Sequence, residues 1–271
     1  MDTEAVRALF DRQMRREAPA DSPGAVVERV GAVVRQTAAP AGGAGPDSEQ
    51  ESDGGWNGVL WSDLDEGSAD TAIAEQIRHF TSLGLEFEWK LYSHDAPHDL
   101  AGRLAAAGFT PEPPETLMIA EAAGLPTDVA VPEGVRLVAV TDAAGVELMA
   151  EVHERAFGTD RTHIRERLLA QLAAAPGSVA AALAMAGDTP VSAARMELPA
   201  GTEFAGLWGG GTVPGWRGRG LYRALVAFRT GLAAERGYRY LQVDASSQSR
   251  PILRRLGFEE LSTTTPYVHT P

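Results

Sequence analysis

The chain has 271 residues, of which 44% are hydrophobic and 23% charged, as in an ordinary globular protein with room for two domains. It contains no cysteine, which excludes disulfides, thiolate zinc sites and cysteine nucleophiles, and we expect no metal site. The formal net charge of −13 argues against nucleic-acid binding and favours a cationic acceptor such as an amine.

The first half of the chain predicts alternating helices and strands. Apolar residues recur at helical spacing over residues 3–16 and 69–83, and a short helix is expected at 100–107. Valine-rich or alternating patterns predict strands at 25–37, 56–64, 85–92 and 117–120. Residues 39–55 include five glycines and few large apolar side chains, which indicates a loop.

The second half of the chain, from residue 135 onward, predicts a longer series of elements. Asp142 is a candidate helix cap. The expected elements are strand 135–140, helices 142–157 and 163–173, hairpin strands 178–185 and 191–198, strand 203–212, helix 221–237, strand 238–244, helix 250–256 and strands within 259–268. The order of elements and the similarity of segments 100–109 and 252–258 indicate an internal repeat.

Residues 208–223 combine a strand end, a glycine-rich turn and the first turn of a helix. Gly218 and Gly220 permit backbone conformations that other residues resist, and the N–H groups of the helix start form an anion site. Arg217 and Arg219 add guanidinium groups suited to a pyrophosphate. The segment lacks both the nucleoside-triphosphate loop and the dinucleotide-binding glycine pattern. It therefore predicts a different phosphate cradle.

At Arg217–Tyr222 the sequence resembles the GCN5-related N-acetyltransferase (GNAT) superfamily, whose signature is Gln/Arg-x-x-Gly-x-Gly/Ala. The first Arg and the middle Gly match, while Tyr222 stands in place of the final Gly/Ala. The resemblance implies acetyl-coenzyme A as cofactor. It assigns the pyrophosphate to Arg217, Gly218, Arg219, Gly220, Leu221 and Tyr222, and the pantetheine arm to Thr212, Val213 and Ser246.

The resemblance extends in full order over 135–268 and more weakly over the first half, where Asp65–Ala69 replaces the cradle. It implies an α/β fold (α+β, mixed sheet) with two GNAT-like, acyl-CoA N-acyltransferase domains, each a mixed β-sheet flanked by helices. Residues 1–124 would be a degenerate domain without a coenzyme site, 125–134 a linker and 135–271 the acetyltransferase domain. The first domain would cover the second, wall the acceptor pocket, or both.

Several residues could act as the general base that acetyl transfer to an amine requires. The carboxylates are Glu197 and Glu203, near a hairpin tip, and Asp244 at a strand end, each with a structural alternative as a turn carboxylate or a cap. His153 and His163 are suited by their ordinary pKa, although a structural or exposed role is the alternative for both.

The general acid is less clear, because the family's tyrosine position corresponds to Leu253 and its usual asparagine to Ser246. Ser249 or Tyr267 would substitute, or the thiolate would leave unassisted. Gly209–Gly211 stands where the family's fourth strand bulges, which would open main-chain N–H groups toward the thioester.

We therefore expect a cytoplasmic N-acetyltransferase that moves an acetyl group from acetyl-coenzyme A to a small-molecule or peptide amine by direct attack, with neither nucleic-acid nor membrane partners. Ser249, Asp244, Glu203 and Tyr267 are the catalytic candidates. Mycothiol synthase exemplifies the tandem layout. The alternative is a coenzyme-binding sensor or self-protection protein with little turnover. The acceptor and the oligomeric state stay open.

Overall fold

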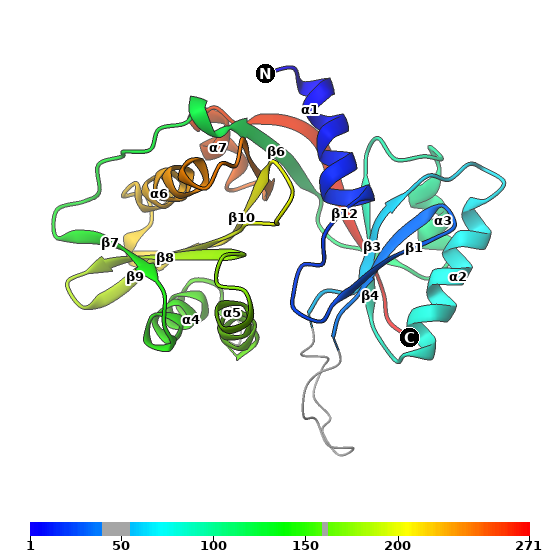
Figure 1. Ribbon diagram of the computed structural model, residues 1–271, viewed down its shortest axis with the longest axis horizontal. Helices are drawn as coiled ribbons and strands as arrows, with labels where there is room; N and C mark the ends of the chain where they lie inside the picture. The colour runs from blue at the N-terminus through cyan, green and yellow to red at the C-terminus, as the bar shows by residue number, and fades with distance from the viewer. Residues whose placement is uncertain (40–54, 159–161) are drawn as a thin grey trace, which may run out of the picture. The chain divides into compact units, whose positions relative to one another are not determined.

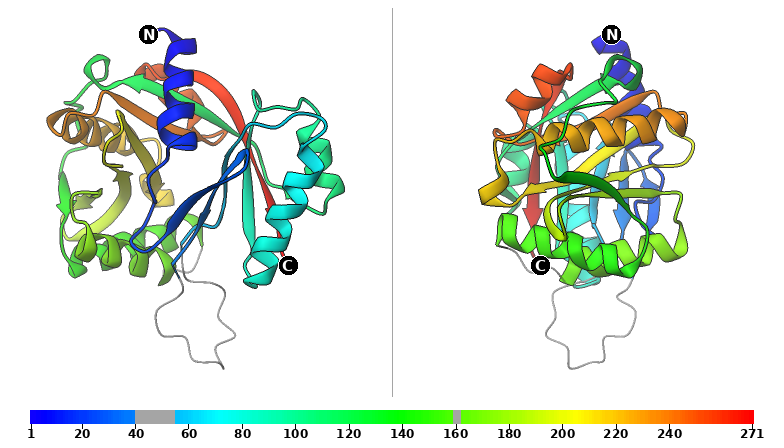
Figure 2. Two further views of the ribbon diagram at one scale, coloured as in Figure 1. Left: turned by 45° about the vertical axis from the view of Figure 1, so that its right-hand side comes forward. Right: turned by 90° about the vertical axis from the view of Figure 1, so that its left-hand side faces the viewer.

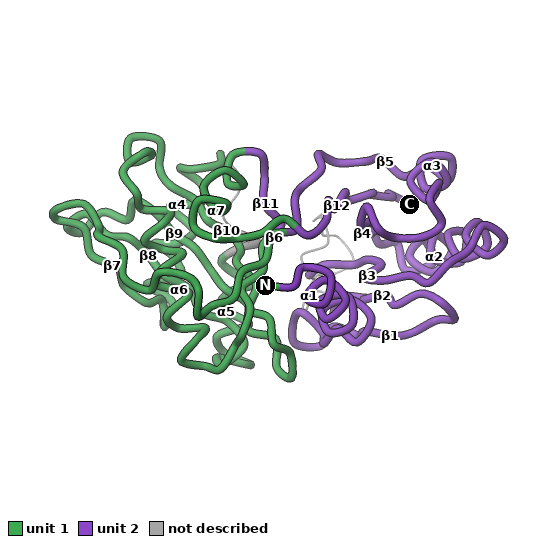
Figure 3. The backbone as a smooth tube through the Cα atoms, turned by 90° about the horizontal axis from the view of Figure 1, so that it is seen from above, with its two compact units in different colours: residues 1, 118–243, 248–260 green, residues 2–117, 244–247, 261–271 purple. Residues whose placement is uncertain are grey.

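The computed structural model describes residues 1–39, 55–158 and 162–271, which form two compact units (Figure 1). Unit 1 comprises residues 1, 118–243 and 248–260, and unit 2 comprises residues 2–117, 244–247 and 261–271 (Figure 3). Of the loop expected at residues 39–55, residues 40–54 lie outside the described residues. The expected fold class is confirmed: the sheet is mixed and helices flank it.

Unit 2 contains most of the first half of the chain. Its sheet has the order β1-β2-β3-β4-β12, with β3 and β4 parallel and the other neighbours antiparallel. The elements are α1 (Thr3–Phe10), a π-helical continuation (Asp11–Arg16), β1 (Val26–Val30), β2 (Val33–Thr37), β3 (Gly58–Ser62), α2 (Ala69–Ser82), β4 (Phe87–Tyr92), α3 (Leu100–Ala106), the short β5 (Thr110–Pro111) and most of β12 (Glu259–His269).

Two strand predictions in this unit were wrong. The single strand expected at 25–37 is a hairpin, because Gly31 turns the chain with φ +61° between two valine-rich arms. The separate strands expected within 259–268 form one strand, β12, whose residues 264–269 pair with β4. The hairpin is local, so only the turn at Gly31 was missed, whereas β12 pairs with a strand far away in the sequence.

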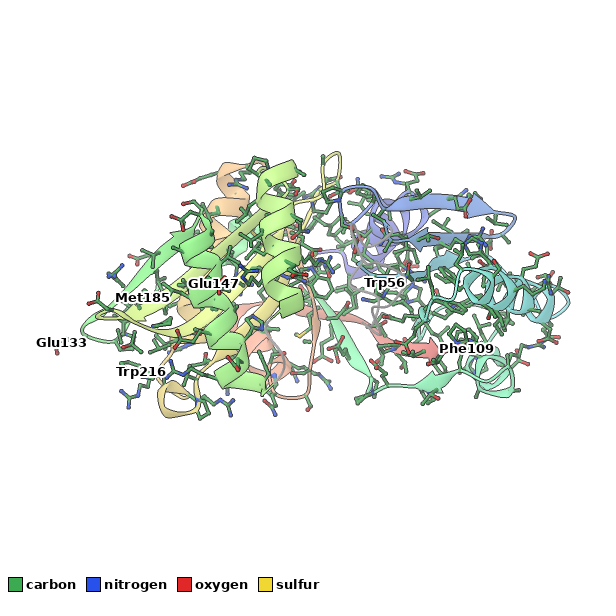
Figure 4. The ribbon with its side chains drawn as sticks, turned by 90° about the horizontal axis from the view of Figure 1, so that it is seen from below. Trp56, Phe109, Glu133, Glu147, Met185 and Trp216 are labelled. Atoms are coloured by element: carbon green, nitrogen blue, oxygen red, sulfur yellow. The ribbon has the colours of Figure 1, made fainter. Side chains whose placement is uncertain are left out.

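Aromatic rings build the core of unit 2. Phe80 from α2 stacks on Phe87 from β4 with ring centroids 4.3 Å apart. Phe109, labelled in Figure 4, meets both Phe87 and Trp89 edge to face. All four rings are buried.

A buried arginine ties the N-terminal helix to this unit. The Arg15 guanidinium donates to both carboxylate oxygens of Asp95, at 2.8 and 2.7 Å, and to Asp11 at 2.7 Å. Its Nε donates to the Leu60 carbonyl at 3.1 Å, and the group lies 4.0 Å from the Tyr92 ring centroid. Every donor direction of the fork is therefore engaged inside the protein.

We predict that Arg15→Ala destabilises the protein by about 3–5 kcal/mol, because Asp95 would stay buried without its cation. Urea unfolding followed by tryptophan fluorescence measures this loss. Arg12→Ala removes an exposed arginine of the same segment and should change stability by less than about 0.5 kcal/mol. Equal effects of the two substitutions would contradict a stabilising role for the buried ion pairs.

Unit 1 has a mixed sheet of order β6-β11-β10-β9-β8-β7. Helices α4 and α5 cover one face and α6 the other (Figures 1 and 2). The elements are part of β6 (Glu115–Glu121), a 3₁₀ turn (Ala122–Gly124), β7 (Val135–Val140), α4 (Ala143–Phe157), α5 (Thr162–Ala174), β8 (Val179–Ala186), β9 (Thr189–Glu197), β10 (Phe204–Thr212), a 3₁₀ turn (Pro214–Trp216), α6 (Leu221–Glu235), most of β11 (Tyr240–Ala245) and α7 (Arg250–Leu256).

Small and branched apolar side chains fill both faces of this sheet. On the α4 face, Val152, Met149 and Leu183 belong to one buried cluster. On the α6 face, Leu225 packs against Ala182 and Ala194, whose small side chains let the helix approach closely. The predicted Asp142 cap is present, since its carboxylate accepts from the Gly145 N–H at 2.8 Å.

The two units share a strand–helix–parallel strand order. In unit 2 it is β3-α2-β4 followed by α3, and in unit 1 it is β10-α6-β11 followed by α7. The repeat inferred from the sequence is consistent with this order, while the boundaries 1–124 and 135–271 stay predictions. The compact units depart from contiguous halves, because residues 118–121 of β6 join unit 1 and residues 261–269 of β12 join unit 2.

Within the described parts of the chain, no helix is both long and apolar enough to cross a bilayer.

Candidate active site

Strand β10 pairs with its parallel neighbour β11 only over its first three residues. The two strands pair at Phe204↔Tyr240, Ala205↔Leu241 and Gly206↔Gln242, whereas β10 continues to Thr212. On its other edge β10 pairs with β9 at Trp208↔Arg195 and again at Gly211↔Ala193. Two residues of β10 thus oppose one of β9 between these pairs. The bulge predicted at Gly209–Gly211 is confirmed, and it bends the strand.

Three consecutive glycines let neighbouring side chains touch the main chain of this bulge. A Cβ atom at Gly209, where φ is +58°, would lie 3.2 Å from the His153 ring. One at Gly210 would lie 2.9 Å from the Tyr222 ring, and one at Gly211 2.8 Å from the Phe157 ring. His153 and Phe157 come from α4 and Tyr222 from α6, so the two faces of the strand alternate as expected. Any larger residue here would push these rings away.

The turn after β10 leads into an uncapped helix start. Gly218 and Gly220 have φ of +77° and +85°, and Gly220 stands at the N-cap of α6 without a side-chain capping bond. The first-turn N–H groups of a helix have no partner within the helix, and the dipole favours an anion beside them. This geometry fits the predicted phosphate cradle.

The two arginines of the motif make contacts within the protein. Arg217 donates to the carbonyls of Thr212 at 3.1 Å and Ala156 at 2.9 Å, which fixes the turn against β10 and α4. The Arg219 guanidinium lies 4.6 Å from the ring centroid of Trp216, which Figure 4 labels on the turn. Arg217 therefore has a structural role in this turn, and the predicted contact of both arginines with a pyrophosphate stays a prediction.

Thr212 and Val213 are tied to β9. The Val213 N–H donates to the Val191 carbonyl at 3.0 Å, and the Thr212 hydroxyl is 2.8 Å from that of Ser192. The Thr212 carbonyl already accepts from Arg217. The predicted pairing of these two residues with a pantetheine arm stays a prediction.

The corresponding helix start in unit 2 is closed by its own acid. The Asp65 carboxylate accepts from the main-chain N–H groups of Gly67 at 3.1 Å and Ser68 at 2.8 Å, and from the Ser68 hydroxyl at 2.6 Å. The hydrogen bond from the Ser68 side chain, followed by that from its N–H, lowers the pKa of Asp65. A carboxylate therefore lies in the turn just before α2, where its negative charge would repel an anion.

The catalytic candidates of unit 1 are Glu197 and Glu203, which flank the turn between β9 and β10, and Ser249, which precedes α7. Glu203 is 40% exposed, and one carboxylate oxygen lies 3.7 Å from Arg239. Ser249 stands just before α7 and is hydrogen-bonded to Tyr222. Glu197 is paired with Arg167 at 3.3 Å and with Arg195 at 3.6 Å. Leu253, at the family's tyrosine position, is completely buried.

Asp244, Ser246 and Tyr267 belong to unit 2 rather than to the unit that carries the cradle. The Asp244 carboxylate, 2% exposed, accepts from Lys90 at 2.5 Å. Burial acts to lower the pKa of Lys90, but Asp244 and other acidic neighbours raise it above its ordinary value. Tyr267 pairs with Trp89 across β12 and β4 and packs on the core. Spacing along the sequence could not reveal a partner 154 residues away.

His153 is a titratable side chain that lies against the bulge and is 5% exposed. Burial lowers the pKa of His153 and the charge of Arg195 acts in the same direction, while a hydrogen bond with the Gly209 main chain opposes the shift. The imidazole is therefore neutral near pH 7, as a base must be. The side chain of His163, the other histidine considered from the sequence, lies outside the described residues.

One arginine of α6 is buried: only 1% of Arg229 is exposed. Its guanidinium donates to the carbonyls of Leu225 at 3.0 Å and Arg195 at 2.8 Å. Burial lowers the pKa of Arg229 to about 10, so it stays charged at neutral pH.

Comparison with solved structures gives the fold its name. A GCN5-related N-acetyltransferase from Kribbella flavida matches with a TM-score of 0.67 and 19% identity over 99% of this chain and 94% of that one. A tandem GNAT protein from the clavulanic acid biosynthesis pathway matches with 0.61 and 16% over 92% and 84%. An N-acetyltransferase of the same kind from Sphaerobacter thermophilus matches with 0.58 and 19% over 75% and 68%.

No protein-family model matches the sequence, and no curated protein matches it either. The structural likeness confirms the expected resemblance to GNAT proteins in their tandem arrangement. The chain therefore has the GCN5-related N-acetyltransferase fold over nearly its whole length.

We predict that His153 makes unfolding easier in acid. Its folded pKa lies below the unfolded value of about 6.5, so the unfolded chain binds the proton first as pH falls. The free energy of unfolding contributed by this residue is present above about pH 6.5 and is lost below it. Urea unfolding at pH 8 and pH 5 should show a smaller acid loss for His153→Gln than for the wild type. Equal losses would contradict the buried, neutral imidazole.

Proposed function

We propose that the protein is an N-acetyltransferase that moves an acetyl group from acetyl-coenzyme A to an amine by direct attack. One observation carries the proposal: in unit 1 the part of β10 that has left β11 is followed, after a glycine-containing turn, by the uncapped start of α6. An extended chain could pair with the strand edge while its pyrophosphate meets the helix N–H groups. The fold of the matched acetyltransferases supports this assignment.

The residues at the cradle fit such a cofactor. Gly218 and Gly220 hold the turn open with positive φ angles, and Leu221 and Tyr222 supply first-turn N–H groups. The contrast with unit 2, where the Asp65 carboxylate lies in the turn before α2 and would repel a pyrophosphate, supports binding in unit 1 alone. The coenzyme supplies an activated thioester, and the chain binds it, orients it and handles the protons.

Main-chain N–H groups at the bulge would polarise the thioester carbonyl, because preorganised donors stabilise developing negative charge. For deprotonation of the amine, Glu203 and Asp244 remain candidates, and His153 joins them because it is neutral and lies against Gly209. Ser249 and Tyr267 remain candidates for the thiolate side. The formal charge of −13 favours a cationic acceptor, whether a small molecule or a peptide, and a cytoplasmic location stays a prediction.

The alternative is a coenzyme-binding sensor with little turnover. It is favoured by one observation, the buried leucine at the position where the family places its acid. Release of thiol from acetyl-coenzyme A in a screen of amines separates the two functions. A sensor would bind the coenzyme and release no thiol above background.

We predict that Gly220→Ala weakens acetyl-coenzyme A binding by about tenfold or more, because an L-residue resists φ +85° and shifts the N–H groups that hold the pyrophosphate. Isothermal calorimetry measures the affinity. Gly237→Ala is the matched control: this glycine, just beyond the other end of α6, has φ +83° and open space around it. Both variants carry similar backbone strain, so only a cradle in unit 1 would separate their affinities. No binding by the wild type would overturn the proposed function.

A further inference from the structure

Acetyl transfer releases a thiolate, and a nearby donor accelerates its departure. Leu253 cannot donate, and its side chain is sealed in the core. Tyr267 lies in unit 2 and packs on that unit's core. Tyr222 differs from both, since it projects from the first turn of α6 at the position where the family motif has glycine or alanine.

The Tyr222 ring lies along the part of β10 that has left β11. A Cβ atom at Gly210 would be 2.9 Å from Cε2 of the ring and 3.5 Å from Cδ2. Gly210 lies four residues past Gly206, the last residue of β10 paired with β11. The aromatic ring therefore borders the place where the strand edge is open to a ligand.

The hydroxyl end of the same side chain reaches the start of α7. It is hydrogen-bonded to Ser249, which precedes the helix and lies one helical turn before Leu253. A phenol from α6 thus reaches the start of α7, one helical turn before Leu253, where the resemblance leads one to expect a tyrosine of α7 itself. The contact of one ring edge with Gly210 and the hydrogen bond of the hydroxyl with Ser249 together orient the side chain.

The surroundings suit a proton donor. Burial raises the pKa of Tyr222, which keeps the hydroxyl protonated at neutral pH. The charge of Arg229 and the hydrogen bond from Ser249 oppose that rise, and both stabilise a phenolate formed after the proton has left. Arg229 is buried, and its hydrogen bonds go to carbonyl oxygens, so its charge acts at close range.

We propose that Tyr222 is the proton donor to the departing sulfur, an inference that rests on the proposed acetyltransferase function. The amine nitrogen bonds to the carbonyl carbon, and the carbon–sulfur bond breaks with its electron pair on sulfur. The Tyr222 hydroxyl proton passes to that sulfur, giving the thiol of coenzyme A. The phenolate recovers a proton through solvent, which balances the proton that the amine loses. Ser249 is then a positioning residue that orients the phenol.

The first test measures the coenzyme rather than the reaction. A hydrogen bond donated by Tyr222 stabilises the thiolate of bound coenzyme A, so it lowers the pKa of the bound thiol. Tyr222→Phe should raise this pKa by about one unit, read from ultraviolet absorbance of the thiolate against pH. Calorimetry should give the same acetyl-coenzyme A affinity for this variant as for the wild type, within about threefold.

The second test measures thiol release from acetyl-coenzyme A with n-butylamine as the probe amine. Tyr222→Phe should lower the rate by about 100-fold. Tyr238→Phe is the control, because this tyrosine of the same unit donates to the Pro199 carbonyl beyond the far end of α6. It should change neither the bound thiol pKa nor the rate.

Each failure has its own meaning. Absence of acetyl-coenzyme A binding by the wild type would overturn the proposed function and with it the role of Tyr222. Binding with an unchanged thiol pKa in Tyr222→Phe would overturn only the role of Tyr222. Tighter binding by Tyr222→Ala than by the wild type would show that the ring obstructs the coenzyme, which also contradicts donation.

Discussion

The departure of β10 from β11 is the constraint on which the candidate site depends. Pairing with β11 ends at Gly206, and three residues further on Gly209 takes a positive φ where an extra residue enters the strand. Strand edges carry N–H and C=O groups that need partners, so an opened edge in a sheet interior is a place for a ligand. The same bend brings the start of α6, the Tyr222 ring and the His153 ring to one segment.

Unit 2 has the same strand–helix–strand order, but its own charged side chains lie at the bulge and before the helix. Strand β3 also carries a bulge opposite β2, but the carbonyl of Leu60 at that point accepts from Arg15. The helix start after it holds the Asp65 carboxylate. Unit 2 therefore places charged side chains, Arg15 and Asp65, beside the bulge and beside the helix start. The same topology therefore supports internal ion pairs in unit 2 and the proposed coenzyme site in unit 1.

Local patterns sufficed for most elements of unit 1, because its helices and strands alternate within short windows of sequence: the ranges of β7 and α7 agree with those expected. The patterns failed where partners are distant or where charge conflicts with position. Asp244 meets Lys90 across 154 residues. Arg229 can be buried because its guanidinium donates to two main-chain carbonyls, and such partners cannot be predicted from the spacing of residue types. Tyr222 was recognised only as a departure from a motif; its hydroxyl partner became visible only in three dimensions.

The pairing of β12 with β4 has a consequence for how the protein folds during synthesis. Residues 264–269 form the pairing partner of β4, so this strand is synthesised well before its neighbour. At translation rates of about 5–20 residues per second, the edge of β4 waits many seconds for residues 264–269. During that time it is an unpaired edge of the kind that recruits strands from other chains. Folding of unit 2 during synthesis therefore depends on shielding of β4 until β12 has emerged, and loss of residues 264–269 would damage unit 2 directly.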